Sequence, residues 1–149
     1  FNAWLLVQGL ETLHVRMERH VENAEKIAEY LENHDKVEWV SYAGLESSPY
    51  HDLKEKYLPK GASSIFTFGV KGGYESAKTF IEFLELFSLL ANVGDVKSLI
   101  VHPASMTHSQ GTEEENAAAG VYPETIRLSI GLENVDDLIA DLEQGLATI

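Results

Sequence analysis

The sequence predicts an α+β fold: a long N-terminal helix, then a small, mostly antiparallel sheet with helices packed on one face. Apolar residues recur every three or four positions at both ends of the chain, which indicates amphipathic helices. Short β-branched and aromatic runs lie between these helices and predict strands. The connection at Gly94–Asp95 is shorter than the roughly dozen residues that a parallel crossover needs, so we expect antiparallel pairing.

A single helix is expected from Ala3 to about Asn33, with Asn2 as its N-cap. A helix of about 30 residues is longer than usual in globular proteins, and such helices span a whole domain or connect two. His14 and His20 are expected on its surface. Its apolar face is predicted to consist of Leu6, Leu10, Leu13, Met17, Val21, Ala24, Ala28 and Leu31.

The middle of the chain is expected to contain two strands, 37–42 and 64–70, rich in β-branched and aromatic residues. A short helix at 50–58 lies between them and ends before Pro59. After the second strand, glycines in "KGG" form a turn before an amphipathic helix at 74–86. The residues of that helix predicted to face inward are Ala77, Phe80, Ile81 and Leu84.

The last third is expected to begin with two short strands, 88–93 and 97–102. A polar stretch at 104–121 contains the helix-prone segment "TEEENAAAG". The strand "TIRLSIG", 125–131, precedes a final helix whose N-cap is Asn134. The inward residues of this helix are predicted to be Leu138, Leu142 and Leu146.

The composition is that of a soluble globular protein with one domain, residues 1–149. A net charge of −13, with 11 basic against 24 acidic residues, argues against a nucleic-acid partner. No apolar run reaches the roughly 18 residues of a membrane helix, no leader is visible and cysteine is absent, so we expect a cytoplasmic protein. Because the chain begins without Met and enters a helix almost at once, we expect it to be a piece of a longer protein.

Arg127 is one of three arginines and lies within the strand "TIRLSIG". Alternation places it with Thr125 and Ser129 on the face opposite Ile126 and Leu128. The pattern favours a solvated sheet face. A second interpretation stays open, in which the planar guanidinium binds the carboxylate of a ligand through two hydrogen bonds.

Other clusters give weaker indications. The loop "HPASMTHSQ", 102–110, lacks both the sequence elbow of a serine hydrolase and the spacing of a zinc site, so we expect a polar loop bonded to its own backbone and no metal. "GVKGGYES" matches no phosphate-binding motif and is expected to form a plain turn. The acidic runs are expected to be solvated faces.

Three segments resemble a known family: "FNAWLLVQGLETLHVRMERHVENA", "GDVKSLIVHPASMTHS" and "ETIRLSIGLENVDDLIADLEQGL". They are similar to the C-terminal part of the Cys/Met-metabolism enzymes that depend on pyridoxal phosphate (PLP). Within that family, "PYHDLKEKYLPKGASSIFTFGVKGG" and "LLANVGDVKSLIVHPAS" resemble the O-acetylhomoserine sulfhydrylase branch. The resemblance implies a C-terminal small domain of a fold-type-I enzyme, with residues 1–33 as the helix that links it to the cofactor domain.

The same resemblance implies a function and a site. It implies γ-replacement, in which sulfide or a thiol replaces the acetate of O-acetyl-L-homoserine, within a homotetramer whose active sites are completed across a dimer interface. Arg127 corresponds to the family's clamp on the substrate α-carboxylate, Asn92 lines that site, and Thr107 lies near it. Cystathionine γ-synthase and methionine γ-lyase remain alternatives within the family. A non-catalytic interaction module with the same fold is the alternative of another class.

PLP itself is expected in the full-length enzyme and not on this chain. The family binds PLP as a Schiff base through a lysine in a segment resembling S-A-T-K, well upstream of this region. None of the eight lysines here has that context: Lys26, Lys36, Lys54, Lys56, Lys60, Lys71, Lys78 and Lys97. The chain alone is therefore expected to contain no catalytic residue and to be inactive.

Overall fold

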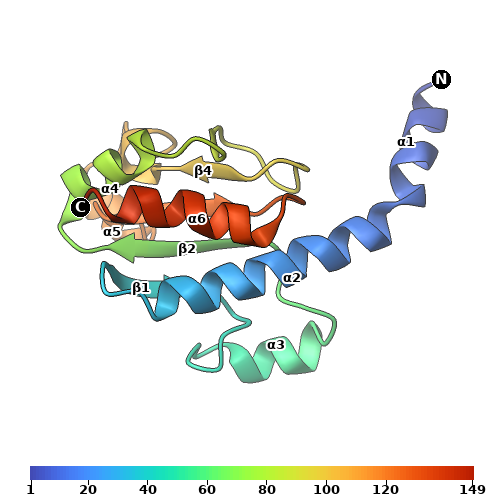
Figure 1. The fold of residues 1–149 in the computed structure, drawn as a ribbon, viewed down its shortest axis with the longest axis horizontal. Helices are drawn as coiled ribbons and strands as arrows, with labels where there is room; N and C mark the ends of the chain where they lie inside the picture. The colour runs from blue at the N-terminus through green and yellow to red at the C-terminus, as the bar shows by residue number, and fades with distance from the viewer.

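A five-stranded sheet forms the centre of the molecule in the computed structural model, which describes all residues 1–149 (Figure 1). The strand order is β1-β2-β5-β4-β3. The bounds are β1 Val37–Ser41, β2 Ile65–Val70, β3 Ser88–Leu89, β4 Leu99–Val101 and β5 Thr125–Ser129. Neighbouring strands are antiparallel except for β3 and β4. The predicted α+β class and mostly antiparallel sheet are confirmed, and β5 occupies the central position.

The parallel pairing of β3 with β4 contradicts the expectation of antiparallel strands around Gly94. Ser88 and Leu89 pair with Leu99 and Ile100, and the nine residues between the strands form a loop without a helix. A long crossover is needed to return the chain along full-length strands. Here the ladder is only two residues long, so a short loop covers the distance.

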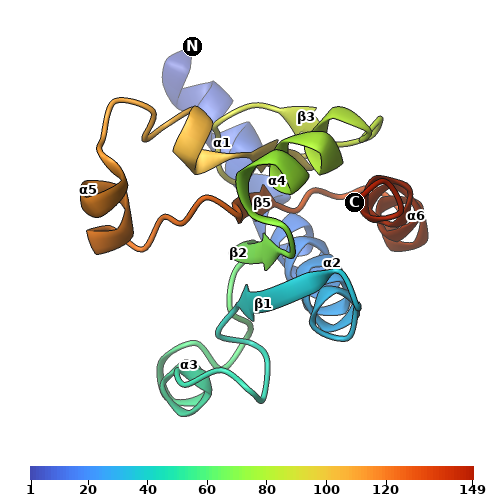
Figure 2. The ribbon, with the colours of Figure 1, turned by 90° about the vertical axis from the view of Figure 1, so that its left-hand side faces the viewer.

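Three helices cover one face of the sheet: α2 Leu13–Glu32, α4 Gly73–Glu82 and α6 Val135–Leu146. Figure 2 shows α2 and α6 beside the strands, with α4 packed over β2. Their buried side chains meet those of Phe66, Phe68 and Leu128 in one apolar core. Asn134 caps α6 as predicted, because its side chain accepts the Asp136 N–H at 2.8 Å. Leu138, Leu142 and Leu146 are fully buried, which confirms the predicted face of α6.

Helix α4 ends four residues earlier than predicted. It ends at Glu82 instead of Leu86, although Ala77 and Phe80 are buried as expected. The carboxylate of Asp141, on α6, accepts the backbone N–H groups of Glu85, Leu86 and Phe87 at 2.8, 2.9 and 3.2 Å. These N–H groups therefore bond to a side chain from another helix instead of continuing the helical pattern.

The N-terminal helix is two helices instead of one. Helix α1, Asn2–Glu11, is separated from α2 by Thr12 and projects away from the sheet (Figure 1). The guanidinium of Arg16 donates to the Gly9 carbonyl at 2.6 Å and to Thr12 Oγ1 at 3.3 Å, around the break. Gly9 also weakens the helix locally, since glycine is a poor helix former. Asn2 does not act as N-cap: it is the first residue of α1, which has no side-chain cap.

The remaining helices lie outside the core. Helix α3, His51–Tyr57, ends before Pro59 as predicted. Helix α5, Glu113–Ala118, starts with a capping box in which Thr112 and Glu115 each bond the other's backbone N–H. A 3₁₀ turn, η1, covers Pro103–Ser105. No helix of the structure is both long enough and apolar enough to cross a membrane.

Tyr30→Phe is expected to raise the pKa of Glu143. Tyr30 Oη donates to the Glu143 carboxylate, which lowers the pKa of this group below its usual value, and His34 Nε2 at 3.2 Å contributes further. Because the pKa of Glu143 is lowered in the folded state, the interaction stabilises the protein above the unfolded-state pKa and is lost as the pH falls through the folded-state pKa.

The measurement is a ¹³C NMR titration of the Glu143 carboxyl group. In the Tyr30→Phe variant its pKa should move back towards the ordinary glutamate value. Tyr57→Phe removes a hydroxyl from an exposed tyrosine elsewhere and should leave Glu143 unaffected. An unchanged titration of Glu143 in Tyr30→Phe would contradict the assignment.

Candidate functional site

Arg127 lies at the middle of β5, the central strand. Its direct neighbours across the ladder are Thr67 on β2 and Val101 on β4. Ile126 and Leu128 are fully buried in the core, so alternation directs Arg127 to the face opposite α2, α4 and α6. The residue is half-buried, and the five ion pairs of the chain all involve other residues. The site therefore presents a permanent cation that no carboxylate of this chain neutralises.

Asn92 lies in the loop between β3 and β4. The loop is brought to the Arg127 face by Gly94, whose N–H donates to Ser129 Oγ at 3.3 Å. Ser129 is two residues after Arg127 on the same strand face. Asn92 itself is exposed, and its Oδ1 accepts the N–H of Val93 at 2.9 Å. The structure therefore brings the loop to β5 but leaves the Asn92 side chain bonded to its own backbone.

Thr107 follows β4 and the turn η1, which packs against β5. Thr107 is exposed, and its Oγ1 lies 2.9 Å from Nδ1 of His108. Its hydrogen-bond partner is therefore its sequence neighbour, and the structure shows no bond from Thr107 to Arg127 or Asn92. The three predicted site residues thus come from β5 and from two segments that follow β3 and β4, and no side-chain hydrogen bond joins them.

The sequence indicates His102 only as part of a polar loop, whereas in the structure the side chain is buried and hydrogen-bonded. It is buried directly after Val101 on β4. Its Nε2–H donates to the Pro123 carbonyl at 2.8 Å, so the neutral ring accepts from Ser105 Oγ–H at Nδ1, also 2.8 Å. His102 thus joins the two ends of the segment 103–123. The expected bonding of this loop to itself is confirmed.

His20 is buried, contrary to its predicted surface position. Its Nδ1–H donates to the Ile130 carbonyl at 2.6 Å, just after β5 ends. Asn23, one turn further along α2, donates to the carbonyls of Gly131 and Glu133 at 3.0 Å each. An apolar periodicity does not reveal polar side chains that pair with the carbonyls at a strand end, and this explains the error.

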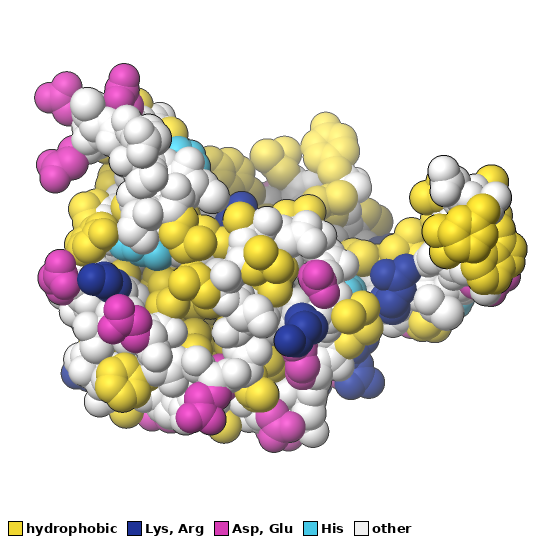
Figure 3. Space-filling model, turned by 90° about the horizontal axis from the view of Figure 1, so that it is seen from above, with side chains coloured by type: hydrophobic (Ala, Val, Ile, Leu, Met, Phe, Trp, Pro, Cys, Tyr) yellow, Lys and Arg dark blue, Asp and Glu magenta, His cyan; other side chains and the backbone are white.

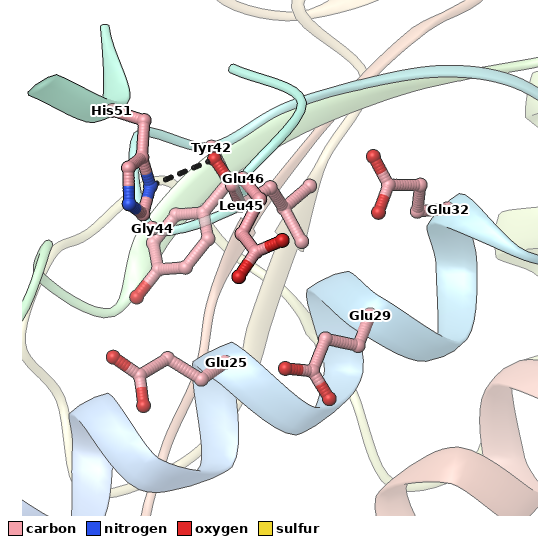
Figure 4. A pocket seen from close by; sticks show the side chains of 8 residues that line it. All are labelled: Glu25, Glu29, Glu32, Tyr42, Gly44, Leu45, Glu46 and His51. Carbon is pink, nitrogen blue, oxygen red and sulfur yellow. Dashed lines mark hydrogen bonds between the residues drawn. The ribbon is translucent and has the colours of Figure 1, made fainter.

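Arg127 does not line either of two surface pockets. One of about 400 Å³ is lined by Tyr42, His51 and glutamates that Figure 4 shows around it: Glu25, Glu29 and Glu32 on α2, with Glu46 opposite. Burial, and secondarily the charge of Glu25, raise the pKa of the Tyr42 phenol. The other, of about 500 Å³, lies between Tyr74, Tyr122 and α5. The acidic pocket repels anions, so it is unsuited to an amino-acid carboxylate.

The fold is an α+β domain whose central strand carries an arginine without an ion-pair partner in the chain. The chain belongs to the Cys/Met metabolism PLP-dependent enzyme family, which matches residues 1–147. This confirms the resemblance found in the sequence.

Known relatives and a solved structure agree. The O-acetyl-L-homoserine sulfhydrylase of Corynebacterium glutamicum is 56% identical over 149 residues, which are 100% of this chain and 34% of that protein. The L-methionine γ-lyase of Fusobacterium nucleatum is 49% identical over 148 residues, covering 99% of this chain and 37% of that protein. A Campylobacter jejuni protein assigned as an O-acetylhomoserine (thiol)-lyase, whose crystal structure contains pyridoxyl-lysine monophosphate, superposes with a TM-score of 0.92. It is 54% identical, and the match covers 98% of this chain and 35% of that one.

The chain thus spans about a third of the length of the curated relatives it matches. Its own lysines do not fit a PLP-binding site. A lysine that forms a Schiff base needs a desolvated pocket that lowers its pKa. Lys54 is the one lysine of this chain that is not exposed, and its Nζ pairs with Glu55 at 2.7 Å. The lysines of this chain are therefore exposed or ion-paired, and none lies in such a pocket.

Proposed function

We propose that this chain is the C-terminal small domain of a PLP-dependent O-acetylhomoserine sulfhydrylase, and that Arg127 binds the α-carboxylate of the substrate. The single observation that carries the proposal is the half-buried guanidinium at the centre of the sheet, without a carboxylate partner in the chain. Such a group binds a carboxylate bidentately, and the fixed geometry orients the ligand. Relatives named as O-acetyl-L-homoserine sulfhydrylases support the substrate.

In the proposed reaction, the Cγ–O bond of O-acetyl-L-homoserine breaks and acetate leaves. A Cγ–S bond forms with sulfide or a thiol, which gives homocysteine or its thioether. PLP, with its lysine on the rest of the enzyme, supplies the electron sink. Arg127 holds the carboxylate so that the amino-acid end is oriented correctly. Asn92 and Thr107 line the same site, which requires the Asn92 side chain to turn away from the Val93 N–H.

A methionine γ-lyase is the second candidate, because a lyase of that name is 49% identical over 148 residues. A cystathionine γ-synthase is the third. All three activities use an amino-acid carboxylate, so the proposed role of Arg127 is common to them. Rates with sulfide plus O-acetyl-L-homoserine, with cysteine plus an activated homoserine, and with methionine alone separate the three.

The proposed domain arrangement assigns residues 1–149 to the small domain, with 1–33 as the link to the cofactor domain, in a cytoplasmic homotetramer. Helix α1 fits this role because its apolar side chains are exposed. Figure 3 shows hydrophobic side chains gathered over the projecting arm. The exposed residues include Phe1, Trp4, Leu6, Val7 and Leu10. A non-catalytic module with the same fold would instead show no turnover when joined to a cofactor domain.

The test is Arg127→Lys and Arg127→Ala in the whole enzyme. Hydrogen bonds to charged groups contribute roughly 1.5–3 kcal/mol, so KM for O-acetyl-L-homoserine should rise about ten- to a hundredfold. KM for sulfide and the visible absorbance of bound PLP should stay unchanged. Arg19→Lys makes the same exchange at an exposed ion pair with Glu22 and serves as the control. An unaltered KM for the amino acid in both Arg127 variants would refute the role.

A further inference from the structure

We propose that Ser98 and Glu133 are positioning residues for the amino-acid site, an inference that rests on the proposed function of Arg127. They form a hydrogen-bonded junction, defined here as Val96–Ser98 with Gly131–Glu133. This junction holds the Asn92 loop against the strand that carries Arg127. The separation between these two substrate-binding segments is therefore set by residues that contact no substrate.

The junction is a continuous chain of hydrogen bonds. The Ser98 N–H donates to Glu133 Oε1 at 2.7 Å, and Ser98 Oγ–H donates to Oε2 at 2.9 Å. Ser98 Oγ in turn accepts the Gly131 N–H at 2.9 Å. A backbone bond from the Leu132 N–H to the Val96 carbonyl, 2.9 Å, adds to these. Ser98 is completely buried, so water does not compete for its hydroxyl group.

The glycine between Ile130 and Leu132 permits this close approach. A Cβ added at Gly131 would lie 2.6 Å from the Lys97 carbonyl carbon and closer still to the Val96 carbonyl oxygen. Any side chain at this position would push the two segments apart. The motif "SIGLE", 129–133, thus contains both Gly131, which must be small, and Glu133, whose carboxylate binds Ser98.

The loop between β3 and β4 depends on this junction. Residues 89–94 are exposed, and apart from the strand pairing the loop is tied to β5 by one long bond, Gly94 N–H to Ser129 Oγ at 3.3 Å. The junction is the stronger attachment because a carboxylate accepts two short hydrogen bonds there. Asn23 on α2 donates to the Gly131 and Glu133 carbonyls, which fixes the other side of the junction to the core helices.

Loss of the junction should displace the loop without unfolding the domain. Neither Ser98 nor Glu133 belongs to the apolar core, which the three helices and the sheet form. A displaced substrate-binding group contacts its substrate less well, which weakens the binding of that substrate. We therefore expect an effect confined to the amino-acid substrate.

The experiment compares Glu133→Ala, Glu133→Gln and Ser98→Ala in the whole enzyme. KM for O-acetyl-L-homoserine should rise on the order of tenfold in Glu133→Ala and Ser98→Ala, while KM for sulfide and the PLP absorbance stay unchanged. Glu133→Gln should recover much of the loss, since its amide oxygen still accepts the Ser98 N–H. If Glu133→Ala does not fold, Ser98→Ala and Glu133→Gln test the proposal. A higher KM in Ser98→Ala than in Glu133→Gln supports it, and an unchanged KM in Ser98→Ala overturns it.

Asn134→Ala is the matched control. It removes the cap of α6 from the neighbouring position, and so lowers thermal stability without touching Ser98. An equal rise in KM in Asn134→Ala would show a general stability effect and overturn the proposal. Arg127→Lys is measured in parallel. If Arg127→Lys raises KM for O-acetyl-L-homoserine but neither Ser98→Ala nor Glu133→Ala does, the positioning role of the junction is overturned and the role of Arg127 stands. No effect of Arg127→Lys overturns the proposed function and the inference with it.

Discussion

Asp141→Ala is expected to lower the free energy of unfolding of this chain by about 3 kcal/mol. Asp141 is 4% exposed, and its carboxylate accepts three consecutive backbone N–H groups between 2.8 and 3.2 Å, from residues 85 to 87. Gln144 Nε2 donates to the same carboxylate at 2.6 Å. Removing it leaves the three backbone N–H groups without this acceptor, and hydrogen bonds to a charged group are among the strongest in proteins.

Urea unfolding followed by circular dichroism measures this effect. The midpoint should fall with little change in slope, and the melting temperature should fall by roughly 6–12 °C. Asp137→Ala is the control: Asp137 lies in the exposed first turn of the same helix, where a charge contributes about 0.3–1 kcal/mol. Asp141→Asn should remain destabilising, because the amide presents N–H groups to backbone N–H groups. A loss below about 0.5 kcal/mol in Asp141→Ala would show that the turn at 85–87 does not need this carboxylate.

Gly131→Ala is expected to destabilise the domain by about 3 kcal/mol, the upper end for overpacking. The added methyl group meets backbone atoms of Val96 and Lys97, with 2.6 Å to the Lys97 carbonyl carbon, and backbone cannot rotate away as a flexible side chain can. The segments must separate, which breaks the Leu132–Val96 backbone bond and weakens the Gly131–Ser98 bond.

Thermal unfolding of the two glycine variants tests this expectation. Gly9→Ala is the same chemical change at a helical position with nothing within 4 Å of the new Cβ. It should stabilise α1 by roughly 0.5–1 kcal/mol, since alanine is the better helix former. Gly131→Ala should melt lower than the parent chain and Gly9→Ala at or above it. Equal melting temperatures for Gly131→Ala and the parent would mean that the backbone at 96–97 adjusts freely.

Much of the fold follows from local patterns. The 3.6-residue period identified α2 and α6, including the buried leucines of α6 and its cap Asn134. Alternation identified β5 and placed Arg127 opposite the core. These features are properties of neighbouring residues, so the sequence contains them directly. The family resemblance was likewise visible in the sequence and was confirmed by comparison.

Other features depend on residues far apart in the chain. Helix α4 ends early because Asp141, more than fifty residues later, takes the N–H groups that would continue it. His20 is buried because the end of β5 offers it a carbonyl 110 residues away. The short strand β3 pairs parallel to β4 because a two-residue ladder needs no long crossover. None of these follows from periodicity.

The sequence by itself determined the α+β class, the buried leucines of α6, the family and the position of Arg127 on β5, because each is written in spacing or in a contiguous motif. Only the tertiary structure decided the break at Thr12, the burial of His20, and the junction that ties the Asn92 loop to β5. The physical reason is that backbone N–H and C=O groups left free at the ends of elements must find partners, and those partners are fixed by packing in three dimensions.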